Sequence, residues 1–242
     1  RFVEWQIGQG VNGLVANGTT AETPTLSDVE QDQLLAEVIR IAAGRVPVIA
    51  GTGSNDTKHV IARTQAAQKA GAAGALVVTP YYNKPTQEGL YQHFKAVHDA
   101  TDLPIIIYNI PPRSVVDMTI ETMKRLAELP RIVGVKDATA DLARPLRTRV
   151  EIGADFLQFS GEDATVGAFM AQGGHGVISV ASNIAPRLMS DWVKAFAAGD
   201  MAAYARLRDR LLPLHLALFC ETSPQPAKYA LSKLGFGSDF VR

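Results

Sequence analysis

The chain has 242 residues, of which 47% are hydrophobic and 20% are charged, a composition typical of a folded globular protein. Its net charge is zero, so the charge gives no indication of a nucleic-acid or acidic-membrane partner. The single cysteine, Cys220, excludes an intrachain disulfide and fits a reducing compartment, so we expect a cytoplasmic protein. No apolar run reaches the roughly 18 residues that a membrane helix needs.

The first residues, 1–7, place apolar side chains near helical spacing. No initiator methionine, capping residue or signal-peptide pattern precedes them. We interpret this pattern as a chain that begins inside a helix, with natural sequence absent before residue 1.

Short apolar runs rich in β-branched residues recur along the chain, separated by amphipathic, alanine-rich stretches. Most of the runs are continuous rather than alternating, as expected for strands buried on both faces of a parallel sheet. The predicted strands are residues 14–16, 46–50, 75–78, 105–108, 132–135, 156–159 and 177–180, and the helices between them include 28–43, 59–70, 87–100 and 120–129.

Alternating strands and helices over about 250 residues indicate either a (β/α)8 TIM barrel or a doubly wound sheet. No Gly-x-Gly-x-x-Gly pattern follows the first strand, which disfavours the dinucleotide-binding sheet. We therefore predict an α/β TIM barrel at residues 1–199, with its first strand missing before residue 1 and strands 2 to 8 visible. The helical stretches that follow, 201–219 and 226–234, predict a C-terminal helical segment at 200–242 that is truncated.

Polar residues gather after the predicted strands, at the end where TIM barrels carry their catalytic groups. Prolines and glycines stand at the opposite ends instead, and this asymmetry predicts an active site. The polar stretches are Gly18-Thr19-Thr20, Gly51-Thr52-Gly53, Thr79-Pro80-Tyr81-Tyr82, Tyr108-Asn109, Lys136-Asp137, Ser160-Gly161-Glu162 and Ser182-Asn183.

Lys136 ends a buried strand, on the same face as Ile132 and Gly134. Partial burial there lowers a lysine pKa and supplies the neutral amine that attacks a carbonyl to form a Schiff base. The alternative is a strand-end lysine that reaches solvent or pairs with Asp137.

Four other strand-end residues have a chemical and a structural interpretation. Tyr108 suits proton transfer at a bound carbonyl, or is a core tyrosine with its hydroxyl at the rim. Thr19 and Thr20 suit carboxylate binding, or cap a turn. Arg113 follows two prolines that stiffen its loop, so it suits a second carboxylate, or is a surface arginine. The five histidines show no metal-ligand spacing, so we expect no metal site.

Together these motifs make the chain resemble the dihydrodipicolinate synthase family, within the superfamily of N-acetylneuraminate lyase and other class I pyruvate aldolases. The resemblance covers nearly all of the chain. The matching stretches are Gly18-Thr19-Thr20-Ala21-Glu22, Val48-Ile49-Ala50-Gly51-Thr52-Gly53, Val78-Thr79-Pro80-Tyr81-Tyr82-Asn83-Lys84-Pro85, Tyr108-Asn109-Ile110-Pro111-Pro112-Arg113, Gly134-Val135-Lys136-Asp137-Ala138-Thr139 and Gly173-Gly174-His175-Gly176-Val177-Ile178-Ser179.

The resemblance implies a lyase of lysine and diaminopimelate biosynthesis that condenses pyruvate with L-aspartate 4-semialdehyde to 4-hydroxy-tetrahydrodipicolinate. It implies no metal or organic cofactor, only the covalent pyruvate imine, and a homotetramer built as a dimer of dimers. The implied catalytic residues are Lys136 for the Schiff base and Tyr108, Thr19 and Tyr82 for a proton relay, with Tyr82 reaching a neighbouring subunit's site. The implied substrate-binding residues are Thr20 for the pyruvate carboxylate, Arg113 for the aldehyde's carboxylate, and Gly161 and Ile178 beside Lys136.

Two other functions stay open at this point. Pyruvate-dependent sugar-acid lyases share the lysine and tyrosine, but the resemblance implies that they lack an arginine at the place of Arg113, since their aldehyde is a neutral polyol. A non-catalytic keto-acid binding barrel would have no need to keep Lys136, Tyr108 and Thr19 together. A phosphate-binding barrel is disfavoured, because the glycine pair Gly173-Gly174 precedes the last strand instead of following it.

Departures from the family pattern concern a turn and a regulatory site. Ala21 stands where the family has glycine, and it would be strained if that position needs a positive φ. Asp28, Gln31 and His59 replace the two histidines and the glutamate of the lysine feedback site, so we predict weak or absent inhibition by lysine. Only Asn55 and Tyr81 match that site.

Overall fold

Six parallel strands, hydrogen-bonded in chain order, form the sheet of residues 48–178. The computed structural model describes all residues, 1–242, and divides them into two units: Val48–Ile178, and Arg1–Pro47 together with Ser179–Arg242. The six strands are β2 Val48–Gly51, β3 Gly74–Val78, β4 Ile105–Asn109, β5 Ile132–Asp137, β6 Leu157–Ser160 and β7 Gly176–Val177.

The strand register aligns one residue near the carboxyl end of each central strand. Val78 pairs with Tyr108, Tyr108 pairs with Lys136, and Lys136 pairs with Phe159. Continuous burial along β3 and β4 explains why these strands lack apolar-polar alternation. The register therefore brings the tyrosine and the lysine into neighbouring positions.

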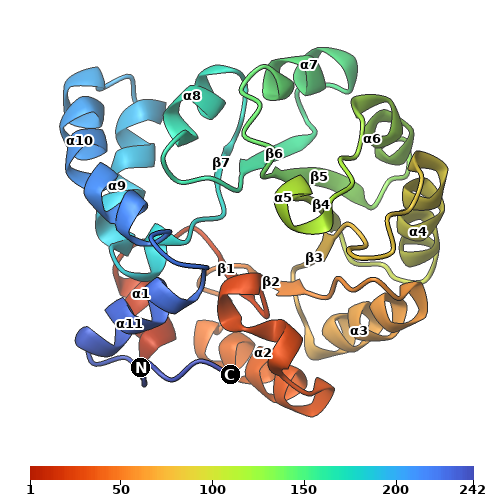
Figure 1. Cartoon of the computed structure of the whole chain (residues 1–242), viewed down its shortest axis with the longest axis horizontal. Helices are drawn as coiled ribbons and strands as arrows, with labels where there is room; N and C mark the ends of the chain where they lie inside the picture. Colours follow the sequence, from red (N-terminus) through yellow and green to blue (C-terminus); the bar gives the residue numbers. More distant parts are fainter. The chain divides into compact units, whose positions relative to one another are not determined.

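Helices follow the strands of this unit, and α3, α4, α6 and α7 lie side by side along the outer side of its sheet (Figure 1). The amino-terminal side chains Asp56, Thr86 and Thr119 accept backbone hydrogen bonds from the first turns of α3, α4 and α6, which fixes where these helices begin. The helices are α3 Thr57–Ala70, α4 Gln87–Asp99, α5 Pro111–Ser114, α6 Ile120–Ala127, α7 Arg144–Glu151 and α8 Val166–Ala171.

The other unit is mainly helical and contains both ends of the chain, which contact each other. Trp5 in its first helix lies with its ring centroid 4.8 Å from that of Phe236, and Arg1 donates to the carbonyl of Gly235. No helix of the structure has both the length and the apolar character needed to cross a membrane. The elements are α1 Phe2–Gly8, β1 Leu14–Ala16, η1 Thr19–Ala21, η2 Thr23–Thr25, α2 Asp28–Ala42, η3 Ala181–Asn183, α9 Pro186–Ala197, α10 Met201–Ala217 and α11 Gln225–Lys233.

The observed elements agree with the predicted ones except in a few places. Strand β5 continues to Asp137, so Lys136 lies inside the strand rather than after it. The last predicted strand, 177–180, is shorter than expected and shifted, because the Ser179 hydroxyl accepts from the backbone of Ser182 and turns the chain into η3. The boundary predicted at residue 199 stays a prediction.

Candidate active site

Lys136 and Tyr108 form the centre of the candidate site. Lys136 on β5 is the register partner of Tyr108 on β4, and its Nζ lies 4.1 Å from the centroid of the tyrosine ring. Tyr108 is 8% exposed, and its ring lies against one side of the amine. The structure thus brings together two of the residues that the sequence identified separately.

Burial lowers the pKa of Lys136 to about 8, while the carboxylate of Asp163 acts in the opposite direction and raises it. At this pKa a useful fraction of the amine is neutral near pH 7, whereas an exposed lysine is almost fully protonated. The site can therefore supply a nucleophilic amine without a metal ion or a second base to remove its proton.

Asp163 is a site residue that the sequence analysis missed. It is 2% exposed and lies three residues beyond the end of β6. Its position after a strand carried a signal, but Glu162 carries the same signal, and only the fold shows which carboxylate is buried near the lysine.

Gly161 and Ile178 lie beside the ends of β5 and β6, and their part in substrate binding stays a prediction. The backbone N–H of Gly161 donates to the Asp137 carbonyl at 2.6 Å, and a Cβ at this glycine would lie 2.7 Å from the Cβ of Ala138. Ile178 donates its backbone N–H to the Ser160 carbonyl at 3.0 Å. A side chain at residue 161 would displace the strand end that follows Lys136, so glycine is required there.

Tyr82 and Arg113 are exposed residues of the loops that follow β3 and β4. The Tyr82 side chain is 87% exposed, and its backbone has a φ of +69°, an unusual conformation for a bulky residue. Arg113 belongs to the single turn α5, whose first two residues are prolines. Their action on a substrate stays a prediction.

Thr19 and Thr20 belong to η1 in the other unit, so their predicted part in the site is untested. The turn is held by the Thr23 hydroxyl, which donates to the Gly18 carbonyl at 2.9 Å. Ala21 has no positive φ, and the left-handed residue is Glu22, with a φ of +56°. The strain considered for Ala21 therefore does not arise.

Glu22 links this turn to the last helix, a contact that the sequence did not reveal. Its carboxylate accepts from the ammonium of Lys228 on α11 and, at 2.9 Å, from the backbone N–H of Arg242. Burial acts to raise the pKa of Glu22, but these contacts outweigh it and lower the pKa below its usual value.

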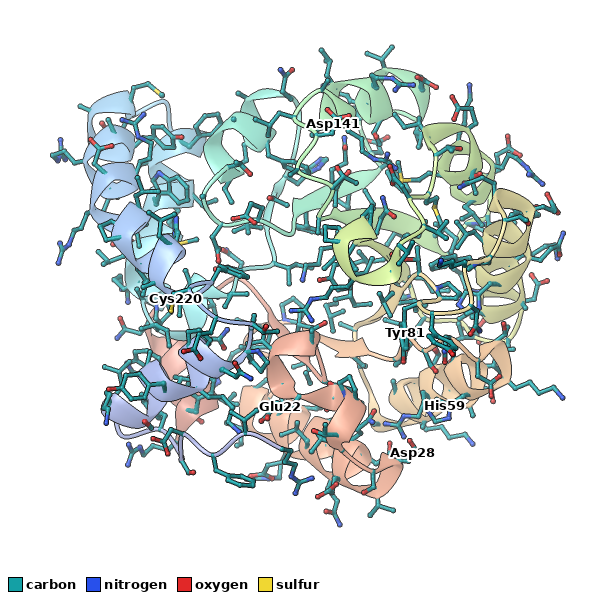
Figure 2. The ribbon with its side chains drawn as sticks, viewed as in Figure 1. Glu22, Asp28, His59, Tyr81, Asp141 and Cys220 are labelled. Atoms are coloured by element: carbon teal, nitrogen blue, oxygen red, sulfur yellow. The ribbon has the colours of Figure 1, made fainter.

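The residues of the lysine feedback pattern lie on separate elements: Asp28 on α2, His59 on α3 and Tyr81 in the loop after β3 (Figure 2). The side-chain amide of Gln31 donates to the carbonyls of Thr23 and Leu26 at 3.4 and 3.1 Å. The Gln31 amide thus forms its hydrogen bonds within its own unit.

Comparison with known sequences identifies the same family along the whole chain. The model of the dihydrodipicolinate synthetase family matches residues 1–242. A 4-hydroxy-tetrahydrodipicolinate synthase from Rhodospirillum centenum is 64% identical over 241 residues, which is 100% of this chain and 83% of that protein. One of the same name from Ruegeria pomeroyi is 60% identical over 242 residues, again 100% and 83% of the two chains.

Solved structures with the same fold include two close matches. A chloride-inhibited dihydrodipicolinate synthase from Acinetobacter baumannii, complexed with pyruvate, is 47% identical with a TM-score of 0.97, covering 100% of this chain and 83% of that one. A 4-hydroxy-tetrahydrodipicolinate synthase from Methylacidiphilum fumariolicum is 41% identical with a TM-score of 0.98, covering 100% and 81%. These matches confirm the predicted fold class, an α/β TIM barrel, of which this chain carries seven strands.

Proposed function

The chain belongs to the dihydrodipicolinate synthetase family, and we propose that it condenses pyruvate with L-aspartate 4-semialdehyde through a Schiff base on Lys136. The product is 4-hydroxy-tetrahydrodipicolinate, and the protein is a lyase of lysine and diaminopimelate biosynthesis. The observation that carries the proposed chemistry is the lowered pKa of Lys136, about 8, in a site where Tyr108 covers the amine.

The first half of the reaction needs the neutral amine. The Nζ lone pair of Lys136 attacks the ketone carbon of pyruvate, and loss of water leaves a protonated imine. Loss of a proton from the pyruvate methyl group then gives the enamine. The Tyr108 hydroxyl would carry protons in these steps, and the position of its ring against the amine supports this role.

The second half forms the carbon–carbon bond. The enamine carbon attacks the aldehyde carbon of L-aspartate 4-semialdehyde, and the aldehyde oxygen takes up a proton and becomes a hydroxyl. The substrate's own amine then attacks the imine carbon, which closes the ring and releases Lys136. Thr20 would bind the pyruvate carboxylate and Arg113 the carboxylate of the aldehyde, while Gly161 and Ile178 would line the pocket beside the amine.

The proposed assembly is a homotetramer of tight dimers, and the proposed location is the cytoplasm. In this assembly Tyr82 of one subunit completes the proton relay of Tyr108 and Thr19 in its neighbour. Its 87% exposure in the isolated chain supports this role, because large aromatic side chains are seldom left so exposed without a partner.

Borohydride reduction in the presence of pyruvate tests the central step. Reduction converts the imine into a stable secondary amine, so peptide mass mapping should find an N-carboxyethyl group on Lys136. The Lys136→Met variant should give no adduct. Lys95→Met is the matched control, since Lys95 is a surface lysine paired with Asp99, and its adduct should equal that of the unchanged protein. Absence of label from Lys136 would refute the proposed chemistry.

A further inference from the structure

A second row of polar residues lies directly beyond the row that contains Tyr108 and Lys136. It consists of Asn109, Asp137 and Ser160, which are 0%, 7% and 1% exposed and are aligned by the strand register. Successive strand residues face opposite sides of a sheet, so these side chains point away from the face that carries Lys136. The proposed reaction uses none of them.

Each residue of this outer row binds the loop that follows its own strand. The Asn109 side-chain oxygen accepts from the backbone of Met118 at 3.1 Å, and its amide donates to Asp117 at 2.7 Å. Asp137 Oδ1 accepts from the backbone and the hydroxyl of Thr139 at 2.8 and 2.7 Å. The Ser160 hydroxyl donates to the Glu162 carbonyl at 2.8 Å. The outer row therefore fixes the loops that leave the site.

The buried guanidinium of Arg144 joins the end of β5 to the loop that follows β4. Its Nε lies 3.1 Å from Asp137 Oδ2, and one terminal nitrogen lies 3.2 Å from Asp117 Oδ2. The other terminal nitrogen donates to the Met118 carbonyl. The Arg144 side chain is only 9% exposed. Its planar guanidinium donates hydrogen bonds to Asp117 and Met118, while its charge forms an ion pair with Asp137.

The loop after β4 that is held in this way carries a proposed substrate-binding residue, and the loop after β5 leads back to Arg144. Residues 110–116, between Asn109 and Asp117, include the turn with Arg113. Residues 138–143 lead from Asp137 back to Arg144 through further hydrogen bonds: the Thr139 hydroxyl accepts from Asp141, and Asp141 accepts from Ala143. Asp141 lies in this loop before α7 (Figure 2).

We propose that Arg144 is a positioning residue that clamps the ends of β4 and β5, and with them Lys136 and the loop of Arg113, from the outer face of the sheet. This inference rests on the proposed roles of Lys136 and Arg113. The clamp has two branches: Arg144 to Asp137 fixes the strand end next to the Schiff-base lysine, and Arg144 to Asp117 fixes the loop that presents the carboxylate-binding arginine.

Burial raises the pKa of Asp137, and the hydrogen bonds from Thr139 and the charge of Arg144 oppose that rise. Loss of the guanidinium would leave Asp137 with less compensation and favour its protonation. The charge of Asp117 acts with burial to raise the pKa of Asp137, so its loss makes the Asp137 carboxylate easier to keep ionised. A change at Arg144 should therefore disturb β5 as well as the loop, whereas a change at Asp117 should disturb mainly the loop.

Separate measurement of the two half-reactions tests the two branches. In Asp117→Asn, an amide keeps an acceptor for Asn109 but loses the ion pair. We expect its KM for aspartate semialdehyde to rise about tenfold, with the rate of pyruvate trapping on Lys136 unchanged. In Arg144→Gln the KM for aspartate semialdehyde should rise and the rate of pyruvate trapping should fall. In Arg144→Lys, which keeps the charge but not the fork, part of the trapping rate should return.

Asp102→Asn is the matched control. Asp102 pairs with Arg131 at 3.1 Å, so this ion pair joins the opposite ends of the same two strands. Its loss should leave the trapping rate and the KM unchanged. A wild-type KM and a wild-type trapping rate in Asp117→Asn and Arg144→Lys would overturn the proposed clamp. Changes in these two quantities no larger than those in Asp102→Asn would overturn it as well. If Arg144→Gln does not fold, the other two variants still decide. Failure of the unchanged protein to trap pyruvate would instead refute the proposed function.

Discussion

The reactivity of Lys136 is set by two opposing effects on one amine. Burial disfavours the ammonium form, and the nearby Asp163 carboxylate favours it, with a resulting pKa of about 8. At pH 7 about one-tenth of such amines are neutral. A lysine with the ordinary pKa of 10.5 is neutral in fewer than about one molecule in a thousand. The strand-end position of Lys136 was visible in the sequence, but Asp163, which moderates its pKa, was not.

Replacement of Asp163 by asparagine should shift the pH dependence of imine formation to lower pH. The group that raises the pKa of Lys136 is then lost, so its pKa should fall below about 8 and the neutral amine should persist in more acidic solution. The initial rate of pyruvate trapping, measured from pH 6 to pH 9, gives the midpoint of this pH dependence, which is the pH at which the rate is half of its maximum.

Glu162→Gln is the control for this shift, because Glu162 lies beside Asp163 in the chain but does not act on the pKa of Lys136. Its midpoint should equal that of the unchanged protein. A midpoint in Asp163→Asn that stays in place or moves upward would contradict the account of Lys136.

At the scale of elements, the sequence predicted the strands well because they are continuous apolar runs between turn residues. It gave no residue ranges for α5, α7 or α8. The single turn α5 begins with two prolines, α7 is largely polar, and α8 is a short apolar stretch that resembles a strand. The clamp residue Arg144 begins α7, so its role could not be recognised without the fold.

The close approach of β5 to β6 depends on Gly134, two residues before Lys136. A Cβ there would lie 2.4 Å from the Leu157 carbonyl oxygen, which is backbone and has no freedom to move aside. We expect Gly134→Ala to lower the free energy of unfolding by about 1–3 kcal/mol, as overpacking does, and to slow pyruvate trapping because the β5 end shifts.

Denaturant unfolding and the trapping rate measure these two effects. Gly8→Ala is the control, since a Cβ at Gly8 would meet nothing within 4 Å and the residue lies at the end of α1. Wild-type stability in Gly134→Ala would show that the two strands can separate at little cost.

At the scale of the whole molecule, the resemblance predicted the family and the fold, and both are confirmed along the full chain. The sequence is a weaker guide to how residues far apart in the chain combine in the proposed site. Thr19 and Thr20 belong to a different unit from Lys136, and the ion pair that links their turn to α11 joins Glu22 to Lys228, more than two hundred residues away. No local pattern encodes such a pairing.

Regulation by lysine is a property of the whole molecule, and here we predict a difference from the lysine-sensitive members of the family. We expect L-lysine to inhibit weakly or not at all, because Asp28 and His59 replace residues of the feedback pattern and the amide of Gln31 is bound to Thr23 and Leu26. A titration of the initial rate with lysine measures this. Strong inhibition at sub-millimolar lysine would contradict it.

Tyr82 provides a test of the proposed assembly. If its hydroxyl acts in a neighbouring subunit, Tyr82→Ala and Lys136→Met should each be nearly inactive alone, yet active when co-expressed in one oligomer. A mixed dimer then has one complete site, formed by the intact Lys136 of one subunit and the intact Tyr82 of the other. Random pairing at equal amounts makes half of the dimers mixed, so about a quarter of the wild-type activity should return. Mixing the separately purified variants without subunit exchange is the control and should restore nothing. If co-expression also restores nothing, Tyr82 acts within its own subunit or not at all, and the exposure of its side chain needs another explanation.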